Sequence, residues 1–248
     1  MQEKIGSADY PDIEAALSYE RLARYLAWAH GNRAEAIRLY ALNTSISEAF
    51  YTPLQMLEVA LRNRCHTVLS EVYGADWFDR PGVILSLFQG LSARKAKLDL
   101  IAGLPAAARV NSDVVNWLSP GRVVASLTFG FWTAFFGNDY EGLWRSCLSR
   151  AVSAPPEKMT RKILDRELTP TRLFRNRIAH HEPILYLDLL KRHHSILQVT
   201  EWLLPTAARW SRENERASAL LARHTETLDA VRARHNELKK RAVAVGPA

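Results

Sequence analysis

Residues 45–74 read SISEAFYTPLQMLEVALRNRCHTVLSEVYG, and this stretch decides the fold class. Ser45 and Glu48 stand at capping-box spacing, which predicts the start of a helix. Apolar residues then recur every three or four positions along one helical face: Leu54, Leu57, Ala60, Leu61, Val68 and Val72. Gly74 is a typical residue to end such a helix. The stretch therefore predicts one long amphipathic helix.

The helical period continues on both sides of this stretch. It predicts helices over 17–29, 33–42, 83–88, 93–103, 122–136, 139–152, 158–168 and 184–210, and a short one around Trp117. Gly31-Asn32 and Pro155-Pro156 read as breaks, and Thr169-Pro170 as the start of a further helix. Because no convincing set of strands appears, we predict an all-α, multi-helix bundle.

The segment after Trp210 differs in composition from the rest. Between residues 212 and 241 it is rich in charge and has no aromatic residue. Its apolar positions have coiled-coil-like spacing, with two histidines in the same seam: Leu221, Leu228, Val231 and Leu238, with His224 and His235. We predict a helical domain over 1–210 and a charged helical tail over 211–248 with a disordered end. The tail is either a solvated helix laid on the body or a helix that binds a partner.

Composition narrows the class of protein. The chain has 248 residues, 48% of them hydrophobic, and 33 Lys+Arg against 26 Asp+Glu, a formal charge of +7. This balance permits a polyanionic partner without requiring one. The longest uncharged run, 123–138, is shorter than the ~20 residues of a spanning helix, so we expect no membrane partner. No apolar stretch follows Met1, and Cys65 and Cys147 lack metal-ligand spacing, so we expect a cytoplasmic protein with reduced thiols.

The best-defined chemistry lies in residues 175–183, which read RNRIAHHEP. A histidine moves protons near neutral pH, and an arginine can neutralise a phosphate during transfer. His180 and Asn176 are four residues apart and share a helix face, whereas Arg175 lies about 140° around the axis from His180. We predict Arg175, Asn176 and His180 as catalytic residues of a metal-independent RNA-cleaving site that needs no cofactor.

Neighbouring residues have two interpretations each. His181 is a second catalytic or RNA-contacting group, or a structural side chain; Arg177 contacts RNA, or pairs with Glu182 and orients the site. The string 62–66, RNRCH, echoes the motif. We interpret Glu58 and Arg62 as an ion pair bracing the bundle, and both, with Asn63 and Glu182, as supporting the site. No third ligand accompanies His193-His194, so no metal site is predicted.

The aromatic string Phe129-Gly130-Phe131-Trp132 is most simply core packing, with Gly130 allowing close helix approach. The alternative is a platform on which an RNA base stacks.

The RN…H string and its context resemble a known family. Ser18 to Arg21, Leu57 to Asn63, Tyr73-Gly74 with Trp77-Phe78, Leu127 to Trp132, and Arg175 to Pro183 occur in the order seen in Abi-like proteins, the abortive-infection proteins of the AbiD/AbiF type in the HEPN superfamily. The resemblance covers residues 17 to 205.

The resemblance implies an HEPN fold and a homodimer whose two motifs face each other. It also implies metal-independent endoribonuclease activity that leaves 2′,3′-cyclic phosphate and 5′-OH ends. It places the protein in phage defence or among toxins, with a possible antitoxin or other inhibitory partner. The alternative is a non-catalytic HEPN module that binds RNA or nucleotide, or regulates a partner protein.

Overall fold

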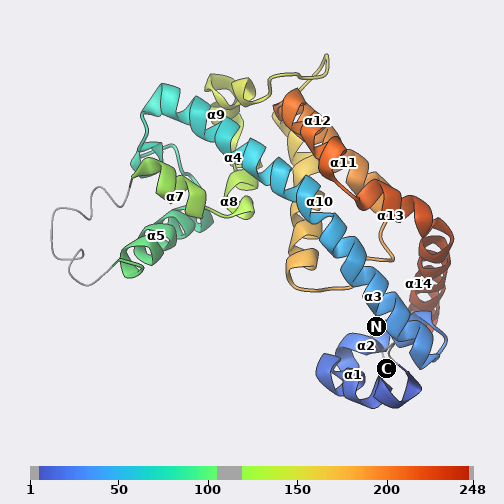
Figure 1. Ribbon diagram of the computed structural model, residues 1–248. Coiled ribbons are helices and arrows are strands. Elements are labelled where there is room, and N and C mark those ends of the chain that lie inside the picture. Colours follow the sequence, from blue (N-terminus) through green and yellow to red (C-terminus); the bar gives the residue numbers. More distant parts are fainter. Residues whose placement is uncertain (1–5, 105–118, 246–248) are drawn as a thin grey trace. The chain divides into compact units, whose positions relative to one another are not determined.

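The computed structural model describes residues 6–104 and 119–245. All regular structure in these two ranges is helical and neither contains a strand, which confirms the all-α class (Figure 1). The chain divides into two compact units. The first comprises Met1–Thr52, Phe174–His193 and Glu215–Ala248, and the second Pro53–Leu173 and His194–Asn214.

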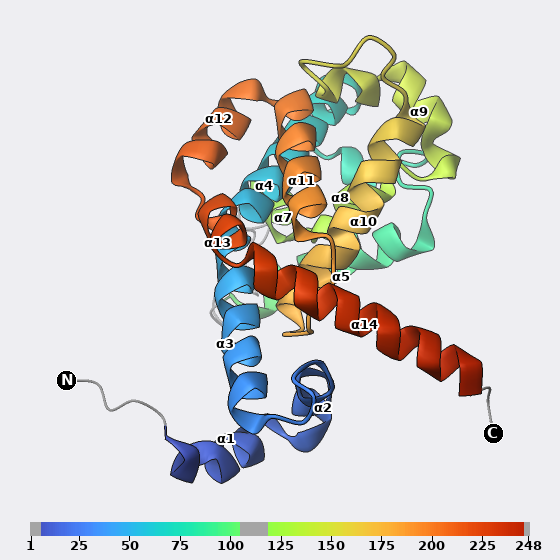
Figure 2. The same cartoon turned by 90° about the vertical axis from the view of Figure 1, so that its right-hand side faces the viewer.

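The first unit brings the N-terminal helices together with the C-terminal tail. It contains η1 (Ser7–Asp9), α1 (Tyr10–Leu17), α2 (Tyr19–Trp28), α3 (Arg33–Ala49), α13 (Ala217–Arg223) and α14 (Thr225–Val245), with the end of α10 (Arg161–Ala179) and the start of α11 (Leu189–Leu203). Helix α2 packs against α3 and α14, and α13 packs against α3 (Figure 2). The predicted break is confirmed: Gly31 has φ 84°, and the Asn32 side chain caps α3 by accepting from Glu35 N at 3.1 Å.

The tail helices belong to the core of this unit. Of the four apolar residues in the predicted seam, Leu221, Leu228 and Val231 are buried and Leu238 is half-buried. The Arg234 side chain also donates to the carbonyl of Ala27 at the end of α2, at 3.3 Å. The tail is therefore helical and packed against the N-terminal helices. Its predicted disordered end falls partly on residues 246–248, outside the described residues, and α14 continues to Val245.

The second unit is built around an aromatic cluster. It contains most of α4 (Tyr51–Tyr73), then η2 (Trp77–Asp79), α5 (Leu87–Ala102), α7 (Pro120–Ser126), α8 (Phe129–Ala134), η4 (Asn138–Tyr140), α9 (Glu141–Ser146), η5 (Leu148–Ala151), the first part of α10, the second part of α11, and α12 (Pro205–Asn214). Trp77 is fully buried, with ring centroids 5.7 to 6.2 Å from those of Phe131, Trp132 and Phe135. Such edge-on and tilted contacts are favourable beyond the area they bury.

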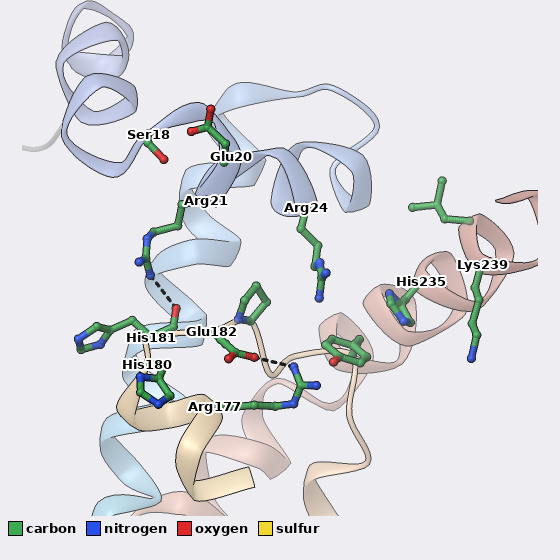
Figure 3. Close-up of a pocket in the computed structure, with 13 residues that line it drawn as sticks. Ser18, Glu20, Arg21, Arg24, Arg177, His180, His181, Glu182, His235 and Lys239 are labelled. Atoms are coloured by element: carbon green, nitrogen blue, oxygen red, sulfur yellow. Dashed lines mark hydrogen bonds and ion pairs between the residues drawn. The ribbon is translucent and has the colours of Figure 1, made fainter. Parts of the chain in front are cut away.

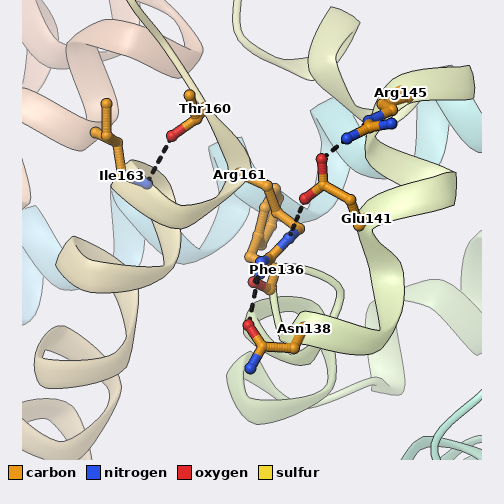
Figure 4. A network of polar contacts seen from close by, with 7 residues as sticks. All are labelled: Phe136, Asn138, Glu141, Arg145, Thr160, Arg161 and Ile163. Atoms are coloured by element: carbon orange, nitrogen blue, oxygen red, sulfur yellow. Dashed lines mark hydrogen bonds and ion pairs between the residues drawn. The ribbon is translucent and has the colours of Figure 1, made fainter.

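A buried arginine fixes the start of α10 in this unit (Figure 4). Arg161 donates to the carbonyl of Phe136, to Asn138 Oδ1 at 3.1 Å and to Glu141 Oε2 at 2.9 Å. Glu141 also accepts from Arg145 at 3.1 Å. Hydrogen bonding from Arg161 holds the pKa of Glu141 below its ordinary value.

Two helix boundaries differ from the sequence prediction because packing overrides local signals. Ser45 and Glu48 do not start a helix: α3 runs through them to Ala49, and α4 begins at Tyr51. Thr169-Pro170 does not start a helix either, since Pro170 lies inside α10. This helix buries Leu164 and Leu168 in the second unit and Phe174 in the first, which offsets the hydrogen bond that the proline removes.

Other predicted helices are shorter or divided. Residues 83–86 are not helical, and α5 begins at Leu87. The predicted helix 122–136 is two helices, because Thr128 caps α8 by accepting from Phe131 N at 3.3 Å. The predicted helix 139–152 contains only α9 and two 3-10 segments, and the one over 184–210 begins at Leu189, with its break before Pro205 as predicted.

The short helix expected around Trp117 lies outside the described residues. None of the helices in the two described ranges is long and apolar enough to cross a membrane.

Candidate functional site

The end of α10 opens onto a hollow of about 910 Å³ within the first unit (Figure 3). The hollow is lined by α2, the segment after α10, and α14: Ser18, Glu20, Arg21, Arg24, Arg177, His180, His181, Glu182, Pro183, Tyr186, His235, Leu238 and Lys239. Four of the predicted site residues line it together: His180, His181, Arg177 and Glu182.

The backbone that presents the two histidines is a tight helix ending. His180 N donates to the carbonyl of Asn176 at 2.9 Å, the last α-helical bond. His181 then adopts φ 55°, its N–H donates to Ile178 O at 3.1 Å, and Glu182 N donates to Arg177 O at 2.8 Å. These last two backbone hydrogen bonds form a Schellman motif, in which glycine usually occupies the position of His181. Histidine is one of the few other residues that adopt this conformation with some frequency.

Two side chains from earlier helices hold this ending in place. Arg21, on α2, donates its Nη1–H to the carbonyl of His181 at 3.0 Å. Asn43, buried on α3, donates to Glu182 O at 3.4 Å and accepts from Ile184 N at 2.8 Å. The buried amide thus satisfies backbone groups on both sides of Pro183. Consequently His180 and His181 sit on a segment fastened from two helices.

The hollow carries more positive than negative charge. Its permanent cations are Arg21, Arg24, Arg177 and Lys239, and its carboxylates are Glu20 and Glu182. One charge of each sign cancels locally, because Arg177 Nη1 lies 2.8 Å from Glu182 Oε2. The salt bridge suggested by the sequence is therefore present. A hydrogen bond from the backbone, followed by one from the Ser18 side chain, lowers the pKa of Glu20 and favours its carboxylate form.

The α14 side of the hollow is aromatic as well as basic. The rings of Tyr186 and His235 have centroids 4.2 Å apart with an interplanar angle of 31°, and Trp28 packs against both at 5.9 and 6.1 Å. The Arg24 guanidinium lies over the Tyr186 ring, 5.8 Å from its centroid. Partial burial, followed by the charges of Arg24 and Lys239, lowers the pKa of His235.

Arg175 and Asn176 occupy a different position from His180. Both are half-buried on the last turns of α10, and neither lines the hollow. Asn176 contributes its carbonyl to the helix ending, as described above. The structure therefore places His180 in the hollow, whereas Arg175 and Asn176 lie outside its lining. The catalytic roles of all three residues stay predictions.

Three of the four residues predicted to support the site lie on α4 in the second unit, whereas Glu182 lines the hollow of the first. Glu58 and Arg62 are half-buried and Asn63 is exposed, and Arg62 Nε donates to Asn63 Oδ1 at 3.3 Å. Their supporting role stays a prediction.

The 62–66 echo of the motif has structural contacts. Arg64 donates to the carbonyls of Ala151 and Arg150 at 2.9 and 2.8 Å. His66 Nδ1 accepts from Trp77 Nε1 at 3.0 Å, and burial lowers its pKa. Both side chains therefore help to hold the second unit together.

The aromatic string of α8 is core packing, as its simplest interpretation predicted. Phe131 and Trp132 are fully buried and Phe129 is 2% exposed, so no base can stack on them. Gly130 is not required for close approach, since an added Cβ would meet its nearest neighbours at 3.7 to 3.8 Å, an ordinary contact distance. The stacking interpretation and the role given to Gly130 are both wrong.

Sequence reasoning missed the residues that complete the hollow. Arg24, Tyr186 and Lys239 received no role, while Arg21 and His235 were noted only within a resemblance and a seam. The single available signal was the placement of His235 among apolar tail positions.

In the two described ranges no group of three or more His, Cys, Asp or Glu could hold a metal ion.

Comparison with known proteins adds no relative. No protein-family model matches the chain, and no curated protein or solved structure matches it.

Proposed function

We propose that this protein is an endoribonuclease that cleaves RNA without a metal ion, with His180 as a proton-transfer residue. The observation that carries the proposal is the fastened ending of α10, which holds two adjacent histidines in a hollow of net positive charge. Histidines transfer protons near neutral pH, and the arginines beside them suit a phosphodiester.

The proposed reaction is an internal transfer of the phosphoryl group. The 2′-oxygen of the ribose attacks the adjacent phosphorus while one histidine takes the 2′-hydroxyl proton. The bond from phosphorus to the 5′-oxygen breaks, and that oxygen receives a proton from a second histidine. The products are a 2′,3′-cyclic phosphate and a 5′-hydroxyl. DNA lacks the attacking hydroxyl, so the proposal requires RNA.

The cationic residues have separate proposed roles. Arg175 neutralises the charge that builds on the phosphoryl oxygens, and Asn176 positions His180 or a phosphate oxygen. Arg177 is paired with Glu182 and orients the segment. His180 and either His181 or the His180 of a second subunit supply the acid and the base.

The biological setting extends the same proposal. The resemblance to Abi-like proteins supports phage defence by abortive infection, or action as a toxin, in the cytoplasm. It also supports a homodimer with a composite active site, and an antitoxin or other inhibitory partner.

The test is cleavage of total cellular RNA by the purified protein in EDTA, with end-group analysis of the fragments. We expect cleavage by the wild type, cyclic phosphate ends, and a loss of at least about a hundredfold in His180→Ala, the usual scale of general acid–base catalysis. His194→Ala is the matched control, because His194 is exposed on α11 in the other unit. Equal cleavage by wild type and His180→Ala would overturn the proposal.

A second function has one observation in its favour. Because Arg175 and Asn176 do not line the hollow that contains His180, the site also suits a module that binds RNA or nucleotide without cutting it. That function predicts RNA binding by both wild type and His180→Ala, with no cleavage by either.

A further inference from the structure

The side of the hollow away from the two histidines has no part in the proposed reaction. Figure 3 shows His180 and His181 at one side, His235 and Lys239 at the other, and Arg24 and Arg177 between them. This second side is built by α2 and α14, two helices far apart in the sequence.

Two cations on this side have no ionic partner in the described chain. Neither Arg24 nor Lys239 forms an ion pair there, whereas Arg177 pairs with Glu182, and α14 pairs its own Arg234 and Arg241 with Glu237. Both of these cations line the hollow, and the imidazole of His235 lies between them in Figure 3. Two neighbouring, unneutralised cations form a site for an anion.

The same side also has apolar and aromatic surface. Tyr186 and His235 form a tilted ring pair in close contact, and the Arg24 guanidinium lies over Tyr186. This packing restricts the Arg24 side chain, which reduces the entropy lost when it binds a phosphate oxygen. A basic groove walled by aromatic rings is the usual arrangement for single-stranded nucleic acid.

We propose that Arg24 and Lys239 bind the phosphate adjacent to the scissile one in single-stranded RNA, so that α14 forms part of the substrate site. This inference rests on the proposed RNA substrate and deepens it. The substrate is then a strand of at least two consecutive phosphates, with its bases unpaired along the ring pair. A dinucleotide, which has a single phosphodiester, reaches only one side of the hollow.

The test measures RNA binding rather than cleavage. A fluorescein-labelled, single-stranded RNA of twelve nucleotides is titrated with the full-length His180→Ala protein, with fluorescence anisotropy read at several salt concentrations. In this background we expect Arg24→Ala and Lys239→Ala each to weaken binding by about threefold to tenfold. Each lost phosphate contact should also reduce the slope of log Kd against log salt concentration by about 0.7 for a single strand.

Lys240→Ala is the matched control, because Lys240 follows Lys239 on α14 without lining the hollow. We expect its affinity and salt slope to equal those of the parent, and Lys239→Arg to retain binding. Lys239 is exposed, so its substitution leaves the fold intact.

The outcomes separate this inference from the proposed function. Equal effects of Lys239→Ala and Lys240→Ala, or no RNA binding, would overturn it. Binding that depends on Arg24 and Lys239 supports it even if the wild type cleaves nothing, a result that would overturn only the nuclease proposal.

Discussion

At the scale of single residues, His181 combines a backbone role with a chemical one. It adopts φ 55° at the position where a Schellman ending favours glycine, a conformation that costs a non-glycine residue on the order of 1 kcal/mol. The side chain takes no part in the two hydrogen bonds of this ending, which are made by the backbone. Histidine therefore stands here at a small conformational cost relative to glycine, which favours a function for its imidazole.

Substitution of His181 separates these two roles. His181→Gly should change the free energy of unfolding by between zero and about +1 kcal/mol, because glycine adopts this conformation without strain. His181→Val should lower it by about 1–2 kcal/mol, since a β-branched residue resists positive φ. Urea unfolding measures both. If His181 also transfers a proton, His181→Gly loses RNA cleavage while keeping full stability; cleavage at the wild-type rate would make the residue structural.

At the scale of elements, Asn43 joins α3 to the segment that follows α10. Asn43→Ala removes the acceptor for Ile184 N and the donor to Glu182 O, leaving buried backbone groups without partners. We expect the free energy of unfolding to fall by about 1–3 kcal/mol. Asn63→Ala is the control, since Asn63 is exposed and its loss should cost less than about 0.5 kcal/mol. Similar losses in the two variants would contradict this role for Asn43.

Arg161 fastens the other end of α10, and its contribution depends on pH. The pKa of Glu141 is depressed mainly by hydrogen bonding from Arg161, so this stabilisation is present above the unfolded pKa and is lost as the pH falls through the folded value. Arg161→Ala should cost about 1–3 kcal/mol at pH 7, because the buried carbonyl of Phe136 loses its donor. The difference from wild type should shrink below the ordinary glutamate pKa of 4.5.

Urea unfolding between pH 3 and pH 7, roughly the range in which carboxylates titrate, provides the measurement. Arg145→Ala is the control: Arg145 contacts the same carboxylate but is 77% exposed, so its loss should cost less than about 1 kcal/mol at any pH. A constant difference between Arg161→Ala and wild type across this range would show that Glu141 is not the partner that matters.

The elements also show what the sequence could predict. The apolar stripe of α4 identified the helix because all but one of its members are buried on one face, and packing decides helices of this length. Val72, at 45% exposed, is the exception. Ser45 and Pro170 misled because a cap or a proline is a local preference of a few kcal/mol at most, which burial on both sides outweighs. The residues around His180 could be predicted as a site because they are contiguous in the sequence. The contact of Arg21 with His181 could not be predicted, because the two residues are 160 positions apart and no local pattern specifies which helices become neighbours.

At the scale of the whole molecule, the proposed homodimer makes a prediction that one subunit cannot satisfy. His180 lines the hollow and Arg175 does not, although both belong to one motif. A two-fold interface brings the arginine of one subunit to the histidine of the other, and both copies of each residue near one axis. In such a dimer each active site draws Arg175 and His180 from different chains.

Mixing two inactive variants tests this arrangement. Arg175→Ala and His180→Ala are each expected to lack cleavage. When their subunits exchange at random, half of the dimers contain one of each, and one of the two sites in such a dimer has both wild-type residues. If His181 supplies the second proton transfer, cleavage should then recover to about a quarter of the wild-type rate. Sedimentation of differently labelled chains confirms the exchange. Exchanged but inactive mixtures would mean either that both residues act within one chain or that one site needs His180 from both subunits, and either result would overturn a site composed of Arg175 from one chain and a single His180 from the other.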